Sequence, residues 1–255
     1  TLSLHDALPI FFDRKAAAMR FLLTTKQDMQ YQMRYGFYFI YGILTLFYVL
    51  ILSQINDPVL RSLTGSLIIL GDPAVLGYFF IGGIWLLEQE EDLHSYMAIS
   101  PLKGYEYVLG KMLSLGLVST CSATIIAAIT MSWINPFALA GIVFISSGFF
   151  TLVGLLLATF AKTVNSYLML SVPPALLLLT PGIASLFGIA LPFAEFLPGT
   201  MVLKLIQYLF GKFHEPFLFK IFGLSIWTGV LFVLVVHRVT SKINPSRRNS
   251  YARHS

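Results

Sequence analysis

The chain has 255 residues, of which 56% are hydrophobic, 15% aromatic and only 11% charged. Soluble domains carry roughly 25% charged residues, so this composition excludes a soluble globular domain and predicts an all-α integral membrane protein. The formal net charge of +5 at pH 7 does not call for a nucleic-acid partner, because the placement of positive charges around a membrane matters more than their sum. A single cysteine, Cys121, excludes a disulfide within the chain.

The N-terminal segment divides into two parts. Residues 1–12 are interpreted as a non-native leader, because Thr1–Ile10 resembles translated sequencing-adaptor sequence and is set apart from fold reasoning. Residues 13–34 are basic and keep apolar residues at helical spacing. This pattern predicts an amphipathic helix on the cytoplasmic membrane surface, with a solvated terminal helix as the alternative. The apolar residues concerned are Ala18, Leu22, Met29 and Met33.

Six apolar segments predict six transmembrane helices within one domain over residues 13–242. The second segment has only fifteen residues, fewer than the roughly 20 that cross a bilayer, so it must extend into the acidic stretch after it or be helped by the apolar residues 67–70. The fifth contains Pro173-Pro174 and Pro181, which predict breaks. The spans are residues 37–55, 73–87, 113–134, 137–161, 165–191 and 221–236.

Lysine and arginine are distributed unequally between the two sides of these spans. The termini and the loops on their side hold thirteen, whereas the opposite side holds Arg61, Lys204, Lys212 and Lys220. The positive-inside rule therefore places both termini in the cytoplasm, including the basic tail over residues 243–255. A plasma-membrane location, in a bacterium, is the expectation.

A further helix is predicted on the outer side, between Pro198 and Pro216. Lys204, Gln207 and Lys212 fall on one side of it. This pattern predicts a helix in the outer interface, a short re-entrant pair with the fifth span, or an inert linker. The other side carries an apolar stripe of Val202, Leu205, Ile206, Leu209, Phe210 and Phe213.

The stretch from Glu88 to Lys103 reads EQEEDLHSYMAISPLK and links the second and third spans. Its pattern predicts a short helix with carboxylates in the first turn, where the helix dipole favours negative charge. Leu93, Tyr96 and Met97 would then share one apolar face, and Ser100-Pro101 would end the helix. Such a helix suits docking onto a soluble partner or serves as a solvated linker. The carboxylates are Glu88, Glu90, Glu91 and Asp92.

Several classes of chemistry find no support in the sequence. Neither a nucleotide-binding loop nor metal-ligand spacing occurs, so we expect no enzyme activity, metal or cofactor on this chain. The predicted span cores carry no Asp, Glu, Lys, Arg or His, which argues against a proton- or ion-coupled transporter. Small and polar residues spaced at four favour close helix packing over substrate contact. They are Gly116, Thr120, Thr124, Ser147 and Thr151.

The order of these features resembles the membrane subunits of ABC-2 type ABC exporters, and within them the drug or fluoroquinolone export permeases. The resemblance is carried by Asp72-Pro73-Ala74 opening the second span, the acidic end of that span, Ser100-Pro101-Leu102, and Tyr107–Lys111 entering the third span. It covers about residues 13–242. Asp92 or His94 stands where the family usually has glycine.

The resemblance implies a permease subunit that forms the pathway of an ATP-driven exporter. Its partners would be a separate ABC ATPase, which binds ATP and Mg²⁺, and a second permease subunit in a homo- or heterodimer. The ATPase would contact a coupling helix formed here by Glu88, Glu91, Asp92, Leu93, Tyr96, Met97 and Pro101. A secondary transporter or channel, and a membrane scaffold without transport function, are the alternatives.

Overall fold

The computed structural model describes residues 4–71, 77–100, 102–131, 133–189, 191–211 and 217–243, with side chains from residue 19 onward. These residues form helices and no strand, which confirms the all-α prediction. The helices are α1 (Leu4–Arg34), α2 (Phe37–Gln54), α3 (Pro58–Gly71), α4 (Tyr78–Glu90), α5 (Leu93–Ile99), α6 (Gly104–Thr130), α7 (Pro136–Ala158), α8 (Val164–Leu186), the 3-10 helix η2 (Ala194–Phe196), α9 (Pro198–Leu209) and α10 (Phe217–Ile243).

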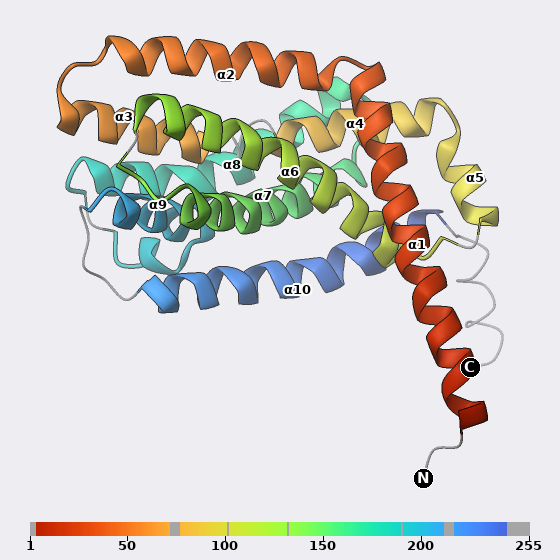
Figure 1. The fold of residues 1–255 in the computed structure, drawn as a ribbon. Coiled ribbons are helices and arrows are strands. Elements are labelled where there is room, and N and C mark those ends of the chain that lie inside the picture. Colours follow the sequence, from red (N-terminus) through yellow and green to blue (C-terminus); the bar gives the residue numbers. More distant parts are fainter. Residues whose placement is uncertain are drawn as a thin grey trace.

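Five of the described helices, α2, α6, α7, α8 and α10, are long and apolar enough to cross a membrane. The second predicted span, residues 73–87, differs from the structure. Its first residues lie outside the described ranges, and α4 has 13 residues, about 20 Å of helix. In Figure 1, α2 leads away from α1, and α3 followed by α4 leads back. The return path is therefore shared between two shorter helices.

The helix of the third predicted span begins at Gly104, nine residues before the predicted start at residue 113. Its first turn is stabilised by Glu106, whose carboxylate accepts a hydrogen bond from the Lys103 backbone N–H at 2.8 Å. Asn135 caps the next helix by accepting from the backbone N–H of Phe137 at 3.0 Å. Asn135 and Pro136 therefore mark the start of α7, between the predicted third and fourth spans.

The fifth predicted span is one continuous helix, α8, although Pro173, Pro174 and Pro181 lie inside it. The expected breaks are absent from this helix. Proline removes a backbone donor, but membrane helices tolerate this loss where neighbouring elements pack closely. Gly199 at the start of α9 provides such packing, because a Cβ at this position would lie 2.1 Å from the Leu178 carbonyl oxygen. The α8–α9 pair therefore depends on glycine at position 199.

The helix α9 occupies the end of the molecule opposite α1 and α5 (Figure 1). The predicted stripe members Val202, Leu205 and Ile206 are buried, but so are Lys204 and Gln207. A helix lying in the outer interface would expose its polar side, so that interpretation is wrong for the described part of this segment. The helix packs against α3, α7, α8 and α10 instead. The predicted stripe member Phe213 and Lys212 lie outside the described residues.

Burial of Lys204 is accompanied by ionic contacts with the adjoining 3-10 helix. The Glu195 carboxylate accepts from Lys204 and, at 2.5 Å, from the Lys220 ammonium of α10. Burial by itself raises the pKa of Glu195, but the hydrogen bonds from these two lysines bring the pKa below its ordinary value. A carboxylate with a lowered pKa stabilises the folded state above its unfolded pKa, and this contribution is lost as the pH falls through the folded pKa.

We therefore expect acid to destabilise the wild-type protein more than a Glu195→Gln variant. Between pH 7 and pH 3, the apparent Tm of wild type should fall further, because only wild type loses the two ionic contacts by protonation at this position. Thermal unfolding in detergent across this pH range measures the difference. Parallel pH profiles for the two proteins would contradict the assignment.

Candidate functional site at the junction of α1, α4, α5 and α6

A buried ionic network joins three helices at the end of the bundle where α5 lies. The Lys111 ammonium on α6 contacts the carboxylates of Asp28 on α1 and Glu88 on α4. Tyr107 donates its hydroxyl proton to Glu88 at 2.6 Å, and Gln32 donates to Asp28 at 2.8 Å. Tyr107 and Lys111 both reach Glu88 because they are four residues apart and share one face of α6.

A second ion pair fastens α1 to the same helix. Arg20 lies 3.2 Å from the Glu106 carboxylate, which is buried. The prediction for α1 placed its apolar residues toward lipid and its cations at headgroups. Leu22 and Met33 are indeed exposed, but Arg20 turns inward to Glu106. In Figure 1, α1 runs across the direction of the long helices, as a helix on a membrane surface does.

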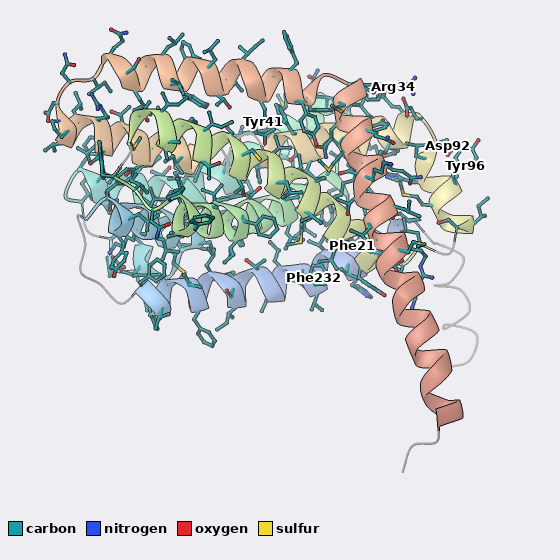
Figure 2. The ribbon with its side chains drawn as sticks, viewed as in Figure 1. Phe21, Arg34, Tyr41, Asp92, Tyr96 and Phe232 are labelled. Atoms are coloured by element: carbon teal, nitrogen blue, oxygen red, sulfur yellow. The ribbon has the colours of Figure 1, made fainter. Side chains whose placement is uncertain are left out.

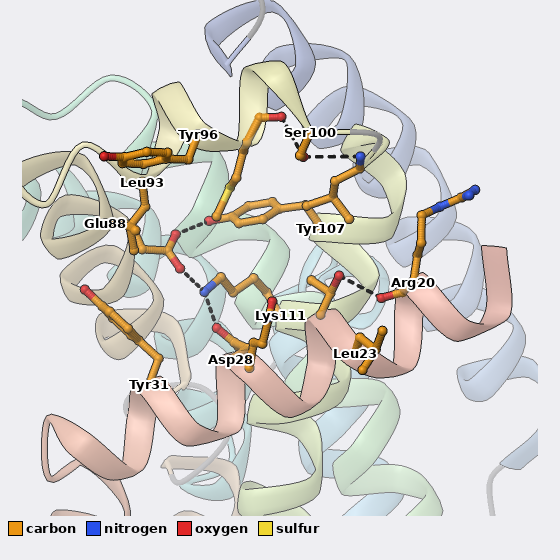
Figure 3. A pocket seen from close by; sticks show the side chains of 14 residues that line it. Arg20, Leu23, Asp28, Tyr31, Glu88, Leu93, Tyr96, Ser100, Tyr107 and Lys111 are labelled. Atoms are coloured by element: carbon orange, nitrogen blue, oxygen red, sulfur yellow. Dashed lines mark hydrogen bonds and ion pairs between the residues drawn. The ribbon is translucent and has the colours of Figure 1, made fainter. Parts of the chain in front are cut away.

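The network forms one wall of a cavity of about 480 Å³. Figure 3 shows the side chains of α1, α4, α5 and α6 converging around Glu88 and Lys111, with Tyr31 and Tyr96 on one side. Apolar side chains make up most of the remaining wall. They are Leu23, Leu93, Met97 and Leu102.

The helix α5 differs from the predicted one in where its acidic residues lie. Glu88 and Glu90 belong to the last turn of α4, Glu91 follows that helix, and α5 has no acidic residue in its first turn. Glu91 accepts from the Tyr35 hydroxyl. Asp92 precedes α5 with φ 56° and accepts from the Ser95 hydroxyl at 2.6 Å. Asp92 thus forms a sharp corner between two helices, and the carboxylates do not exploit the α5 dipole.

The predicted apolar face of α5 is divided between two environments. All three line the cavity, but Leu93 and Met97 are half-buried, whereas Tyr96 lies at its rim and is 66% exposed. Figure 2 shows Tyr96 at the edge of the molecule. Ile99, which sequence reasoning missed, is 86% exposed. Its spacing of three from Tyr96 was the available signal, so the outward surface of α5 is formed by Tyr96 and Ile99.

Two other predicted members of the coupling helix have different positions from those expected. Glu88 is 3% exposed, so it belongs to the buried network and not to a docking surface. Pro101 lies outside the described residues. His94, which sequence reasoning left aside, has its Nε2 atom 3.6 Å from Glu88 and its ring centroid 4.1 Å from that of Trp85. It therefore packs α5 against α4.

The small and polar residues spaced at four lie on α6 and α7. A Cβ at Gly116 would come within 3.0 Å of the Phe144 ring, so this position brings the two helices close together. Ser147 is fully buried and donates to the Ser119 hydroxyl of α6 at 3.3 Å. These contacts favour helix packing. Of the others, Thr151 is fully buried on α7, whereas Thr120 and Thr124 are half-buried on α6.

The helices extend beyond the predicted span cores and carry charged residues at one end of the bundle. Because α6 begins at Gly104, this spanning helix includes Glu106 and Lys111, and the shorter helix α4, which continues to Glu90, includes Glu88. Lys111 lies seven residues into α6, about 10 Å from its start. These charges are therefore near the end of the bundle that carries α5, and not at its middle.

Comparison with known proteins gives a partial match. No family model matches the chain. Over 70 residues the chain is 31% identical to fluoroquinolones export permease proteins from two strains of Mycobacterium tuberculosis. The matched region spans 28% of this chain and 30% of each relative. Together with the five apolar helices, this similarity describes a membrane protein that resembles an export permease over part of its length.

Proposed function

We propose that this chain is the membrane-spanning permease subunit of an ATP-driven exporter of the ABC-2 type. A separate ABC ATPase, carrying ATP and Mg²⁺, would bind it, and a second permease subunit would complete the pathway. The support comes from the 31% identity to export permeases and from the arrangement of α5.

The observation that carries the proposal is the position of α5 between α4, the second part of one path across the bundle, and the spanning helix α6. It follows α4 directly, precedes α6, and turns Tyr96 and Ile99 outward. Its inward side contacts α4 through the His94–Trp85 pair and packs Met97 against the buried cluster of α4 and α6. A force applied to its exposed side would therefore reach both α4 and α6, as coupling to a soluble motor requires.

The buried ions allow a second candidate, an ion-coupled transporter, because ionisable groups inside membrane helices often relay protons. Their position favours a structural role, since Lys111 is about 10 Å from the end of α6 and contacts two carboxylates at once. The two candidates differ in their energy source.

Transport in inverted membrane vesicles separates them. Vesicles that contain this chain and the proposed partner ABC ATPase should accumulate a fluoroquinolone when ATP is added, and a protonophore should leave the initial rate unchanged. An ATPase with its general-base carboxylate neutralised serves as the control and should abolish uptake. Uptake driven by a pH gradient without ATP would overturn the proposal in favour of the ion-coupled transporter.

The proposal includes a plasma-membrane topology with α1, α5 and the end of α10 in the cytoplasm. The thirteen-to-four distribution of lysine and arginine supports this orientation. The structure offers two exposed reporter positions at opposite ends, Ser95 on α5 and Asn56 after α2.

In a Cys121→Ala background, we expect Ser95→Cys to react with an impermeant maleimide only after the cells are opened. Asn56→Cys should react in intact cells, because it lies at the other end of the bundle. Labelling followed by a gel-shift assay measures both. The reverse pattern of accessibility would contradict the orientation.

A further inference from the structure

The cavity at the junction of α1, α4, α5 and α6 has the size and composition of a small-molecule site. Its volume of about 480 Å³ falls within the range of roughly 300–1,000 Å³ found for ligand pockets. Nonpolar atoms form most of its lining surface, and Glu88, Asp28 and Lys111 supply buried polar atoms on one side (Figure 3). Such a cavity suits a ligand with an apolar body and one polar group.

The cavity is lined by two cations and two carboxylates, but Glu106, which pairs with Arg20 behind the wall, adds a third carboxylate to the network. Arg20 and Glu106 pair one to one, whereas the single ammonium of Lys111 contacts two carboxylates, Asp28 and Glu88. Arg20 and Lys111 thus face three carboxylates, those of Asp28, Glu88 and Glu106. An uncompensated buried charge is costly, so a positive group next to Glu88 would be stabilised.

The aromatic side chains of the cavity point to the same kind of ligand. Tyr31, Tyr96 and Tyr107 all line it, and aromatic faces attract cations. One of these rings already holds a cation, because Lys111 Nζ lies 5.3 Å from the Tyr107 ring centroid. At Tyr31, burial is the main cause that raises the pKa of the phenol above its ordinary value; the negative charges of Glu91 and Glu88 add to this effect, and Arg34 opposes it.

We propose that this cavity binds hydrophobic amines, with the ammonium group beside Glu88 and the apolar body between Leu23, Leu93 and Met97. The excess carboxylate selects the positive charge, and the aliphatic wall selects the apolar body. This inference rests on the proposed export function only where it names the amine as the exported substrate. Binding itself requires no ATPase, so it is measured on the permease alone.

The test uses three ligands that differ in one group: 4-phenylbutylamine, 4-phenylbutan-1-ol and 4-phenylbutanoate. Equilibrium dialysis against the protein in nanodiscs, corrected with empty nanodiscs, measures each Kd at pH 7.5. We expect the amine to bind at least about tenfold more tightly than the alcohol, and the acid to bind more weakly than the alcohol. Tenfold corresponds to about 1.4 kcal/mol.

Two substitutions locate the site. Glu88→Gln removes the excess charge and leaves Lys111 paired with Asp28, so the amine should lose its advantage over the alcohol. Glu90→Gln, two residues along the same helix and exposed, should keep that advantage. Leu23→Trp fills the cavity without altering the charges, and should weaken the amine and the alcohol equally.

Equal affinity of wild type for amine and alcohol would overturn the proposal. Retention of the amine preference by Glu88→Gln would also overturn it. If Glu88→Gln lowers the Tm, the Leu23→Trp variant decides, because unchanged amine binding in that variant excludes the cavity. Each of these results would contradict amine binding without contradicting ATP-driven transport. Conversely, a failure to couple to the ATPase would not contradict amine binding.

Discussion

A Lys111→Met substitution should destabilise the folded protein by about 3–5 kcal/mol, the range measured when one partner is removed from a buried ion pair. Methionine has nearly the same length as lysine, so the loss is mainly electrostatic. Asp28 and Glu88 would then face each other as two buried carboxylates without their shared cation. Thermal or denaturant unfolding in nanodiscs measures the change, and a marked loss of folded protein during expression is expected.

The matched control and the rescue come from the same network. Lys26→Met on the exposed side of α1 removes an equal charge and should change stability by less than about 1 kcal/mol. Adding Asp28→Asn and Glu88→Gln to Lys111→Met removes both carboxylates and should restore most of the stability, because neutral polar groups cost less to bury than unpaired charges. Equal stability of Lys111→Met and wild type would contradict a structural role for the network.

The second large effect is expected on α5. Tyr96→Ala together with Ile99→Ala should weaken association with the ATPase by at least about tenfold, since a large apolar side chain that is desolvated at an interface often contributes about 2 kcal/mol or more. Stability of the permease should stay close to wild type, because both side chains are mostly exposed. The Kd is measured with purified ATPase and the permease in nanodiscs.

Leu93 and Met97 provide the contrast for this experiment. They lie on the same short helix but are half-buried against the cavity. Their alanine variants should therefore lower the Tm and leave Tyr96 and Ile99 exposed. Full ATPase affinity in the Tyr96 and Ile99 double variant, with reduced affinity in Leu93→Ala, would mean that the docking surface lies elsewhere.

The membrane class and most helices could be predicted from the sequence because both follow from local composition. A run of apolar residues as long as the one in α7 has few stable alternatives in lipid, and Asn135-Pro136 marks its start through a local cap. The short helix α5 was also predictable from apolar spacing. Its Ser100 end follows from the proline after it in the sequence.

The buried network could not be predicted in the same way, because its members are far apart in the chain. Asp28 and Lys111 meet only when α1 packs on α6, and neither residue belongs to a predicted span core. A signal existed in the spacing of Tyr107 and Lys111, which places both on one face of α6. The burial of Lys204 on α9 was hidden for a related reason: Glu195 and Lys220 approach it from other elements.

Site-specific cross-linking from α5 tests the coupling role most directly. In a Cys121→Ala background, Ser95→Cys carrying a benzophenone maleimide is illuminated in membranes that also contain the proposed partner ABC ATPase. We predict an adduct whose mass equals the permease plus that ATPase, which disappears when Tyr96 and Ile99 are both alanine, and no such adduct from Asn56→Cys. An ATPase adduct from Asn56→Cys and none from Ser95→Cys, or none from either position with both proteins folded and present, would contradict the assignment of α5 as the helix that receives the motor.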